Sequence, residues 1–323
     1  MTKHLGVGIG GSSVAMILAV LAMIAVLAVP LLHSSYDENL SRSLLMYAAM
    51  SLGWNFIGGY TGYVSFGNVV FFGLGAYVAA VVSARGVPDV FVAIPLAAAV
   101  AALFAGLVGL PLLRLRGHYF GIATLAVALA VKELIENVDA LGGGSGLAVH
   151  QSSVFITYFY AMWLVCAVCL LCTWLIARSK LGYAMVAIRE NEEAAAALGI
   201  DPTRYKVFAW MISGAMTASA GATFAFANGN IDPATVFGID YNIFPIAMVI
   251  LGGIGTVAGP LLGAFLLTAF NEVLWGHFPA LHNLFFGLAI VLIVFFVPRG
   301  VMSLFGLHGG RRGFIRYFQA YRV

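Results

Sequence analysis

The chain has 323 residues, of which 62% are hydrophobic and 9% are charged, and its formal net charge is +3. A soluble globular domain carries about 25% charged residues, so a chain with so few charges cannot cover a water-facing surface. The composition therefore excludes a soluble enzyme. It also argues against nucleic-acid binding, because Lys and Arg lie in the gaps between apolar runs and not along one face.

Apolar runs occupy most of the chain, and most come close to the roughly 20 residues that a helix needs to cross a bilayer. The first is read as a retained helix, because the apolar region of a signal peptide has only about 7–15 residues. The chain is therefore predicted to be an all-α integral membrane protein, a polytopic helical bundle of about 8–10 transmembrane segments. The runs cover residues 13–32, 44–59, 66–84, 89–113, 118–136, 154–177, 207–227, 242–270 and 283–297, within a single transmembrane domain over residues 1–323.

Glycine-rich sequences interrupt the apolar pattern once in each half of the chain. The run 242–270 is too long for one crossing and is interrupted at 252–256, and the sequence 58–67 does the same in the first half. Gly-broken or re-entrant helices and a possible internal repeat are expected, and paired breaks point to a transport path. Close helix packing through small residues explains them equally well. The candidate path residues are Asn55, Gly62, Ser65, Asn68, Gly252, Gly255 and Thr256.

Basic residues are distributed unevenly between the polar gaps. Arg42 is the one Lys or Arg in the gaps 34–42, 137–153, 228–241 and 271–282, whereas 114–116, 178–206 and the tail 299–323 are basic. Because short basic loops stay in the cytoplasm, both termini are expected there, with 299–323 as a basic cytoplasmic tail. This parity requires the run 242–270 to enter and return.

The longest polar insertion, residues 178–206, is predicted to form a short amphipathic helix or helix pair on the cytoplasmic face. Gly199 ends the helical pattern, and Asp201 before a proline begins the next helix. Met185 and Ile188 lie beside charged residues, so a surface for a protein partner is expected; a solvated interfacial helix is the alternative. The candidate residues for contact with a partner are Gly182, Arg189, Glu190, Glu193 and Gly199.

Motifs for catalysis and cofactor binding are absent from the sequence. A P-loop needs Gly before Lys, and none of the four lysines follows Gly, so this chain does not supply an ATP site. Cys166, Cys169 and Cys172 lie within an apolar run and are predicted to pack in the bundle. Lys132, Glu133 and Glu136 form either an ion relay or, for Lys132 and Glu136, an i,i+4 pair near the interface.

Four stretches resemble the branched-chain amino acid ABC transporter permeases, specifically the LivM-type subunit of the LivHM family. The stretch 182–199 resembles the cytoplasmic segment of that subunit that couples to ATPases. The stretches 55–77 (NFIGGYTGYVSFGNVVFFGLGAY), 114–126 (RLRGHYFGIATLA) and 252–263 (GGIGTVAGPLLG) resemble its other motifs in the same order. Two positions depart from the family pattern: Tyr63 stands for a usual Gln and Asn68 for a usual His.

The resemblance implies a permease subunit that forms a translocation path for branched-chain amino acids or related small solutes such as urea and amides. Its implied partners are a second, LivH-type permease subunit, two ABC ATPase subunits docked at 178–206, and a periplasmic or extracellular solute-binding protein. ATP and Mg would be bound by the ATPase subunits and no cofactor by this chain. The implied location is the bacterial cytoplasmic (inner) membrane.

Two other classes of membrane protein remain as alternatives. An ion-gradient-driven secondary transporter or channel would need charged groups beside the breaks, which contain mainly Gly, Ser65, Asn68 and Thr256. It would also leave the insertion 178–206 without a role. A membrane-embedded enzyme would need a convergent acid–base or metal set, and the sequence shows none.

Overall fold

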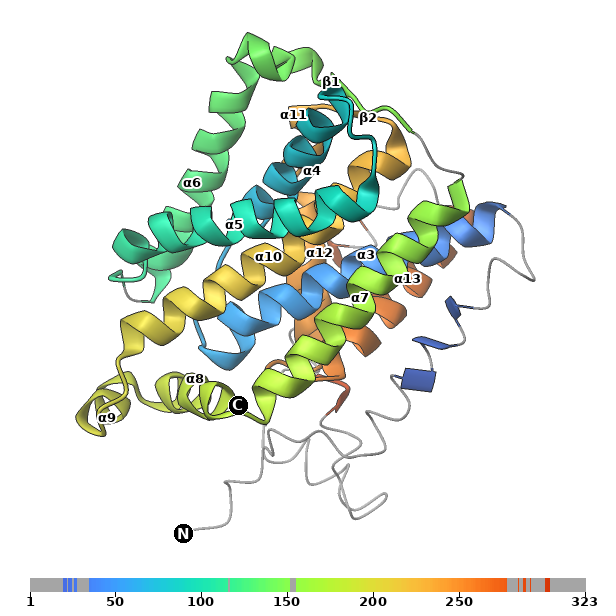
Figure 1. Ribbon diagram of the computed structural model, residues 1–323. Coiled ribbons are helices and arrows are strands. Elements are labelled where there is room, and N and C mark those ends of the chain that lie inside the picture. The colour runs from blue at the N-terminus through green and yellow to red at the C-terminus, as the bar shows by residue number, and fades with distance from the viewer. Residues whose placement is uncertain are drawn as a thin grey trace.

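A computed structural model of the chain describes residues 35–115, 117–151 and 155–277, together with scattered positions among residues 20–27 and 284–302. Helices dominate this part of the chain, and the long ones lie side by side in a bundle (Figure 1). The predicted runs 13–32 and 283–297 and the tail 299–323 fall almost entirely outside the described residues.

The described elements follow the apolar runs closely. The two short strands pair antiparallel and tie two loops together at one end of the bundle. In chain order the elements are α3 (Ser35–Trp54), the π-helix η1 (Asn55–Tyr60), α4 (Val69–Ala84), α5 (Val90–Leu112), α6 (His118–Glu136), the 3-10 turns η2 (Asp139–Leu141) and η3 (Gly143–Ser145), β1 (Leu147–Ala148), α7 (Phe155–Ala177), α8 (Lys180–Glu190), α9 (Glu192–Ala197), α10 (Pro202–Asn228), β2 (Asn230–Ile231), α11 (Pro233–Val236), α12 (Asp240–Gly252) and α13 (Gly259–His277).

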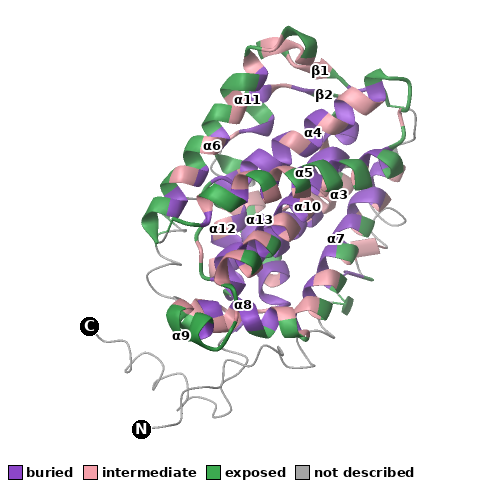
Figure 2. Cartoon of the chain, turned by 60° about the vertical axis from the view of Figure 1, so that its left-hand side comes forward, coloured by how far each residue is buried: buried purple, intermediate pink, exposed green. Residues whose placement is uncertain are grey.

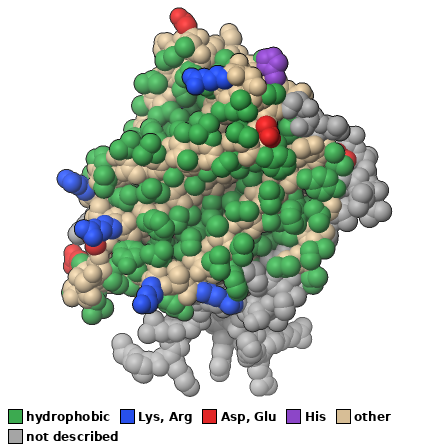
Figure 3. Space-filling view, viewed as in Figure 1, with side chains coloured by type: hydrophobic (Ala, Val, Ile, Leu, Met, Phe, Trp, Pro, Cys, Tyr) green, Lys and Arg blue, Asp and Glu red, His purple; other side chains and the backbone are tan. Residues whose placement is uncertain are grey.

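The outer surface of the bundle is suited to lipid. A wide hydrophobic face carries Lys and Arg mostly near its margins (Figure 3), and on α5 the side chains of Leu103 and Leu107 are each 64% exposed. An exposed apolar surface of this extent marks a membrane-facing protein. Together these features confirm the prediction of an all-α integral membrane protein. The described helices long and apolar enough to cross a membrane are Val90–Leu112, His118–Glu136, Ile156–Ala177, Pro202–Asn228 and Pro233–Gly252, with shorter apolar helices at Val69–Ala84 and Gly259–Leu274.

Two of the gaps expected from the sequence are helical in the structure. Helix α3 begins at Ser35 and takes in most of the gap 34–42, and α13 continues to His277 through the first part of the gap 271–282. The sequence predicts non-helical connections at 34–42 and 271–282, and this prediction is wrong for most of the first gap and the first part of the second. Hydropathy marks where a helix is apolar, whereas polar residues can extend it, and Asp37 in the first turn of α3 also complements the helix dipole.

The predicted break in the run 242–270 is confirmed. Helix α12 ends at Gly252, α13 begins at Gly259, and the two helices pack against each other. Gly252 and Gly263 allow this close approach, because a Cβ at either position would lie 1.8 Å from a backbone oxygen of the other helix. Both helices are longer than the run length predicts, since α12 begins before residue 242 and α13 continues past residue 270.

Helix α10 is the centre of the bundle and packs against α3, α4, α5 and α7. Buried residues concentrate in the interior of the bundle around α10. The faces of α5, α6 and α7 that point away from the interior carry exposed residues (Figure 2). Helices α4 and α10 also approach each other closely. A Cβ on Gly75 would lie 2.1 Å from the Ala218 oxygen, and one on Gly221 would lie 2.1 Å from the Phe72 oxygen.

Gly221→Ala is expected to lower the stability of the folded chain by about 2 kcal/mol, because the added methyl group forces α4 and α10 apart. Gly106→Ala is the matched control, since its Cβ would meet the Met211 sulfur at an ordinary 3.4 Å. The midpoint of thermal unfolding of the detergent-solubilised chain measures the difference. Equal midpoints for the two variants would contradict the close packing of α4 and α10.

Candidate functional site

The first glycine break is the π-helical turn η1, which continues α3. Trp54 covers Gly58 so closely that a Cβ there would lie 2.2 Å from the indole ring. The Trp54 indole nitrogen donates to the Ser65 carbonyl oxygen at 2.8 Å, which fixes the chain that follows the break. π-Helical turns are rare in proteins, and many of those that occur lie at functional sites.

Asn55 joins this break to the second one. Its Oδ1 accepts a hydrogen bond from the Gly255 nitrogen at 2.8 Å, and its Nδ2 donates to the Thr256 oxygen at 2.9 Å. The side chain is fully buried, so these bonds replace the ones that water would make. Gly59 permits the approach, because a Cβ there would lie 1.9 Å from Asn55 Oδ1. Three candidate path residues, from positions about 200 apart in the sequence, therefore meet.

Arg189 of α8 contacts both breaks at the place where Asn55 joins them. Its Nη1 donates to the Gly59 oxygen at 2.9 Å, and its Nη2 pairs with Glu190 at 3.0 Å. Gly62 and Gly255 have positive φ angles of 76° and 75° and leave room for the Arg189 side chain. A Cβ would lie 2.8 Å from Arg189 Cγ at the first position and 2.5 Å from Nη1 at the second. The candidate path and partner-contact residues thus form one site, which we name the break junction (Asn55, Gly59, Gly62, Arg189, Gly255 and Thr256).

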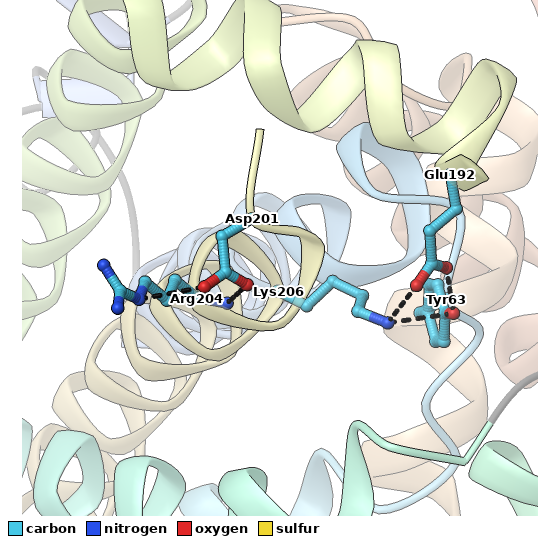
Figure 4. A network of polar contacts seen from close by, with 5 residues as sticks. All are labelled: Tyr63, Glu192, Asp201, Arg204 and Lys206. Atoms are coloured by element: carbon cyan, nitrogen blue, oxygen red, sulfur yellow. Dashed lines mark hydrogen bonds and ion pairs between the residues drawn. The ribbon is translucent and has the colours of Figure 1, made fainter. Parts of the chain in front are cut away.

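A buried ion pair between Glu192 and Lys206 ties α9 to α10 (Figure 4). Lys206 Nζ lies 2.9 Å from Glu192 Oε1 and donates to the Tyr63 hydroxyl oxygen at 3.0 Å. That hydroxyl donates to Glu192 Oε2 at 2.5 Å, and Lys206 Nζ also lies 4.2 Å from the centre of the Tyr63 ring. The Lys206 side chain is only 2% exposed. Its charge is therefore compensated by one carboxylate and one aromatic ring.

Glu192 and Lys206 are not among the candidates drawn from the sequence. A lysine near the start of an apolar helix is expected to lie at the membrane interface. Lys206 is buried instead, because α9 packs over α10. Tyr63 stands out in the sequence only as a departure from the family pattern. In the structure it connects the chain after η1 to both charges of the pair.

The apolar side chains of α8 face the bundle and not a partner. Met185 and Ile188 are 0% and 3% exposed, so the expectation that they form a partner surface is wrong. An amphipathic helix lying along a bundle buries its apolar stripe against it. The outward side carries Tyr183, which is 57% exposed, and beyond α9 Leu198, which is 82% exposed. Glu190 and Glu193 are exposed on the same segment.

The glycines of this segment serve two different purposes. Gly182 is buried where α8 follows α7, and a Cβ there would lie 2.4 Å from the Ile176 oxygen. Gly199 ends the segment with a φ of 84° and has open space around it. Asp201 then accepts a hydrogen bond from the Arg204 nitrogen, which caps α10 as the sequence predicts.

The remaining path candidates lie outside the break junction. Asn68 is buried against α10, where its Nδ2 donates to Ser213 Oγ at 3.0 Å and to Thr217 Oγ1 at 3.2 Å. Ser65 is buried and bonded to Trp54 through its carbonyl. Gly252 lies where α12 turns towards α13, pressed against the Gly259 oxygen.

The charged residues near the end of α6 and the three cysteines of α7 were the other groups singled out in the sequence. Lys132 Nζ lies 3.6 Å from Glu136 Oε1, which confirms the i,i+4 pair, and both side chains are partly exposed. Cys166 and Cys169 are buried in the bundle and Cys172 is half-buried, as expected for packing residues. Among the described residues no cluster of His, Cys, Asp or Glu could hold a metal ion.

The sequence is similar to those of known transport permeases. LivM, a high-affinity branched-chain amino acid transport system permease protein, is 29% identical in Salmonella typhimurium and in Escherichia coli K12, over 92% of this chain and 77% of each relative. LsrC of Yersinia pestis, an autoinducer 2 import system permease protein, is 30% identical over 54% of each chain. No solved structure shows a significant match. A family model described as the permease component of branched-chain amino acid transport systems matches residues 38–294, and the chain therefore belongs to this family of membrane permeases.

Proposed function

We propose that this chain is the membrane-spanning permease subunit of an ATP-binding-cassette importer for branched-chain amino acids or related small solutes such as urea or amides. It would form a translocation path and couple it to ATP hydrolysis on separate subunits. The observation that carries the proposal is the break junction, where Arg189 of the peripheral helix α8 bonds to the first glycine break beside the second.

The arrangement suits the transmission of movement from outside the bundle. A protein that pushes or pulls on α8 and α9 displaces Arg189 and Glu192 together. Arg189 then acts on both breaks, and Glu192 acts on α10 through Lys206. Gly62 and Gly255 have positive φ angles, which glycine adopts more readily than other residues. Breaks in helices at such glycines can absorb the changes in backbone dihedral angles that a rocking movement of the helices requires.

The proposed assembly follows from this role. Two ABC ATPase subunits would dock on 178–206 and hold ATP and Mg, so that this chain binds no cofactor. A second, LivH-type permease subunit and a periplasmic or extracellular solute-binding protein would complete the importer. The proposal places both chain termini in the cytoplasm of a bacterium, on the side of α8, with the bundle in the inner membrane. The names of the LivM and LsrC relatives support an import role for a small solute.

Leu198→Glu is expected to abolish recovery of an ATPase subunit with the tagged chain from gently solubilised native membranes. Leu198 is 82% exposed beyond α9, and a glutamate there would place an unpaired charge in the surface that a docked ATPase covers. Val87→Glu is the control, because Val87 is exposed in the turn between α4 and α5 at the far end of the bundle from α8. Co-purifying proteins are identified by mass spectrometry.

Recovery of a P-loop ATPase with the wild-type chain and Val87→Glu, but not with Leu198→Glu, supports both the importer and its docking surface. An ATPase recovered equally with all three contradicts the docking surface alone. A chain recovered without any ATPase, in a complex stable enough to retain other subunits, contradicts the importer and favours an ion-gradient-driven secondary transporter or channel.

A further inference from the structure

Residues 61–68, which we name the strap, connect η1 to α4 without helical structure. Helix α4 has 16 residues and so spans about 24 Å, less than the roughly 30 Å of a bilayer core. The Phe66 nitrogen donates to Thr124 Oγ1 of α6 at 3.1 Å, and Asn242 Nδ2 of α12 donates to the Phe66 oxygen. Both helices belong to segments long and apolar enough to cross a membrane, so the strap lies at membrane depth.

The side chains of the strap alternate between buried and exposed. Thr61 and Ser65 are 1% and 0% exposed, whereas Val64 and Phe66 are 44% and 43% exposed. Gly62 is exposed as well. Successive side chains of an extended chain point to opposite sides. The strap therefore has an inward face and an outward face, and Gly62, Val64 and Phe66 form the outward one.

The inward face is fixed to the bundle by hydrogen bonds from both directions. The Trp54 indole nitrogen donates to the Ser65 carbonyl oxygen at 2.8 Å, and the Tyr63 hydroxyl donates to Glu192 Oε2 at 2.5 Å. The first bond comes from α3 and the second goes to α9. These contacts set the register of the strap, so that its other side chains stay turned outward.

The outward face is unsuited to lipid. Among the described residues, the backbone groups of Gly62 and Val64 have no hydrogen-bond partner. Irregular backbone does not face lipid within the hydrocarbon region, where unpaired polar groups are costly. A helix of a neighbouring subunit bonds its own backbone groups internally and leaves none for the strap. Water supplies both donors and acceptors, so the outward face is best matched by water.

The outward face is continuous with the break junction. Gly62 belongs to both, and a Cβ there would lie 2.8 Å from Arg189 Cγ. Val64 follows two residues later on the same face. A displacement of α8 therefore reaches the outward face through Arg189, without passing through the buried side chains of the inward face.

We propose that the outward face of the strap lines the water-filled translocation path, with Val64 and Phe66 as the side chains that the path exposes. The proposal rests on the proposed function and adds two lining residues to it. It also gives Ser65 and Asn68 a different role from the one expected from the sequence. Both are buried, so they hold the strap and α4 in place and do not line the path.

The test measures the reaction of single cysteines with a negatively charged thiosulfonate, 2-sulfonatoethyl methanethiosulfonate, in the assembled complex in lipid nanodiscs. The reagent needs a thiolate, which forms in water and not in lipid. Val64→Cys and Phe66→Cys report on the outward face. Leu107→Cys is the matched control, because Leu107 is 64% exposed on the apolar face of α5. Ser65→Cys reports on the inward face, and the wild-type chain gives the background from its own cysteines.

Val64→Cys and Phe66→Cys are expected to react at least about tenfold faster than Leu107→Cys and Ser65→Cys, because only the outward face meets water. Trapping the ATPase subunits with ATP and vanadate is expected to change the rates at the outward face and not at Leu107→Cys. Adding Arg189→Gln is expected to remove this dependence on nucleotide while the outward cysteines still react.

Three outcomes overturn the proposal. Equal rates for Val64→Cys and Leu107→Cys place the outward face in lipid. A Val64→Cys that reacts in the isolated detergent-solubilised chain, but in no nucleotide state of the complex, is covered by a partner subunit. A Ser65→Cys that reacts as fast as Val64→Cys contradicts the alternation.

These results are independent of ATPase recovery. Fast labelling of the outward face in a complex without an ATPase keeps the water-lined path and rejects the importer. A recovered ATPase together with an unreactive outward face rejects only the assignment of the path.

Discussion

Glu192→Gln is expected to destabilise the folded chain by about 3 kcal/mol, because it leaves the charge of Lys206 buried without its carboxylate. The Lys206 side chain is 2% exposed and Glu192 is 21% exposed, so solvent compensates little of the loss. The hydrogen bond from Tyr63 to Glu192 remains possible with an amide oxygen. The effect therefore isolates the charge and leaves the shape of the site intact.

A double-mutant cycle with Lys206→Met checks this expectation. Removing both charges together is expected to recover most of the stability, because the cost of Glu192→Gln comes from an uncompensated buried charge, and that charge is gone when Lys206 is replaced by Met. The midpoint of thermal unfolding of the solubilised complex gives the stability of each variant. Arg204→Gln is the control on the same helix, since its ion pair with Asp201 is exposed (Figure 4) and such pairs contribute about 0–1 kcal/mol. A cycle without coupling would show that the pair does not hold α9 to α10.

Gly255→Ala is expected to reduce ATP-driven uptake more than tenfold while the chain still assembles in the membrane. Its φ of 75° disfavours any side chain by about 1–2 kcal/mol. In addition, the new Cβ would lie 2.5 Å from Arg189 Nη1 and displace the guanidinium from the Gly59 oxygen. The loss of this contact separates α8 from both breaks.

Gly86→Ala separates the two effects in Gly255→Ala. Gly86 has a φ of 85°, and a Cβ there would meet nothing within 4 Å, so the variant carries the backbone strain without the collision. Uptake by Gly86→Ala is expected to stay near that of the wild type. Arg189→Gln, which removes the charge without changing the backbone, is expected to reproduce the uptake defect of Gly255→Ala. Normal uptake by Arg189→Gln would exclude the break junction from coupling.

Part of the site is readable from the sequence because it depends on local properties. Glycine-rich interruptions within long apolar runs predict the breaks at η1 and between α12 and α13, and both are present. The cap of α10 at Asp201 and the stop at Gly199 depend only on neighbouring residues, and both are confirmed. The family resemblance of the short motifs is confirmed by a family match over residues 38–294.

The residues that contact the two breaks are distant in the sequence, so the local sequence does not predict them. Nothing in the run around Asn55 indicates that its side chain bonds to Gly255 and Thr256, about 200 positions away. The inward face of α8 is likewise decided by the bundle. Met185 and Ile188 have the spacing of a partner surface and of a packing surface alike, and only the presence of the neighbouring helices selects burial.

By itself, the sequence determined that this is an all-α membrane protein with two glycine breaks and a polar segment at 178–206, because hydropathy and the freedom of glycine act within single segments. The tertiary structure decided that these three features meet at Arg189, that Lys206 is buried against Glu192, and that the strap turns Val64 and Phe66 outward. The physical reason is that buried polar groups must find partners in three dimensions, and the packing of distant helices decides which partners are within reach.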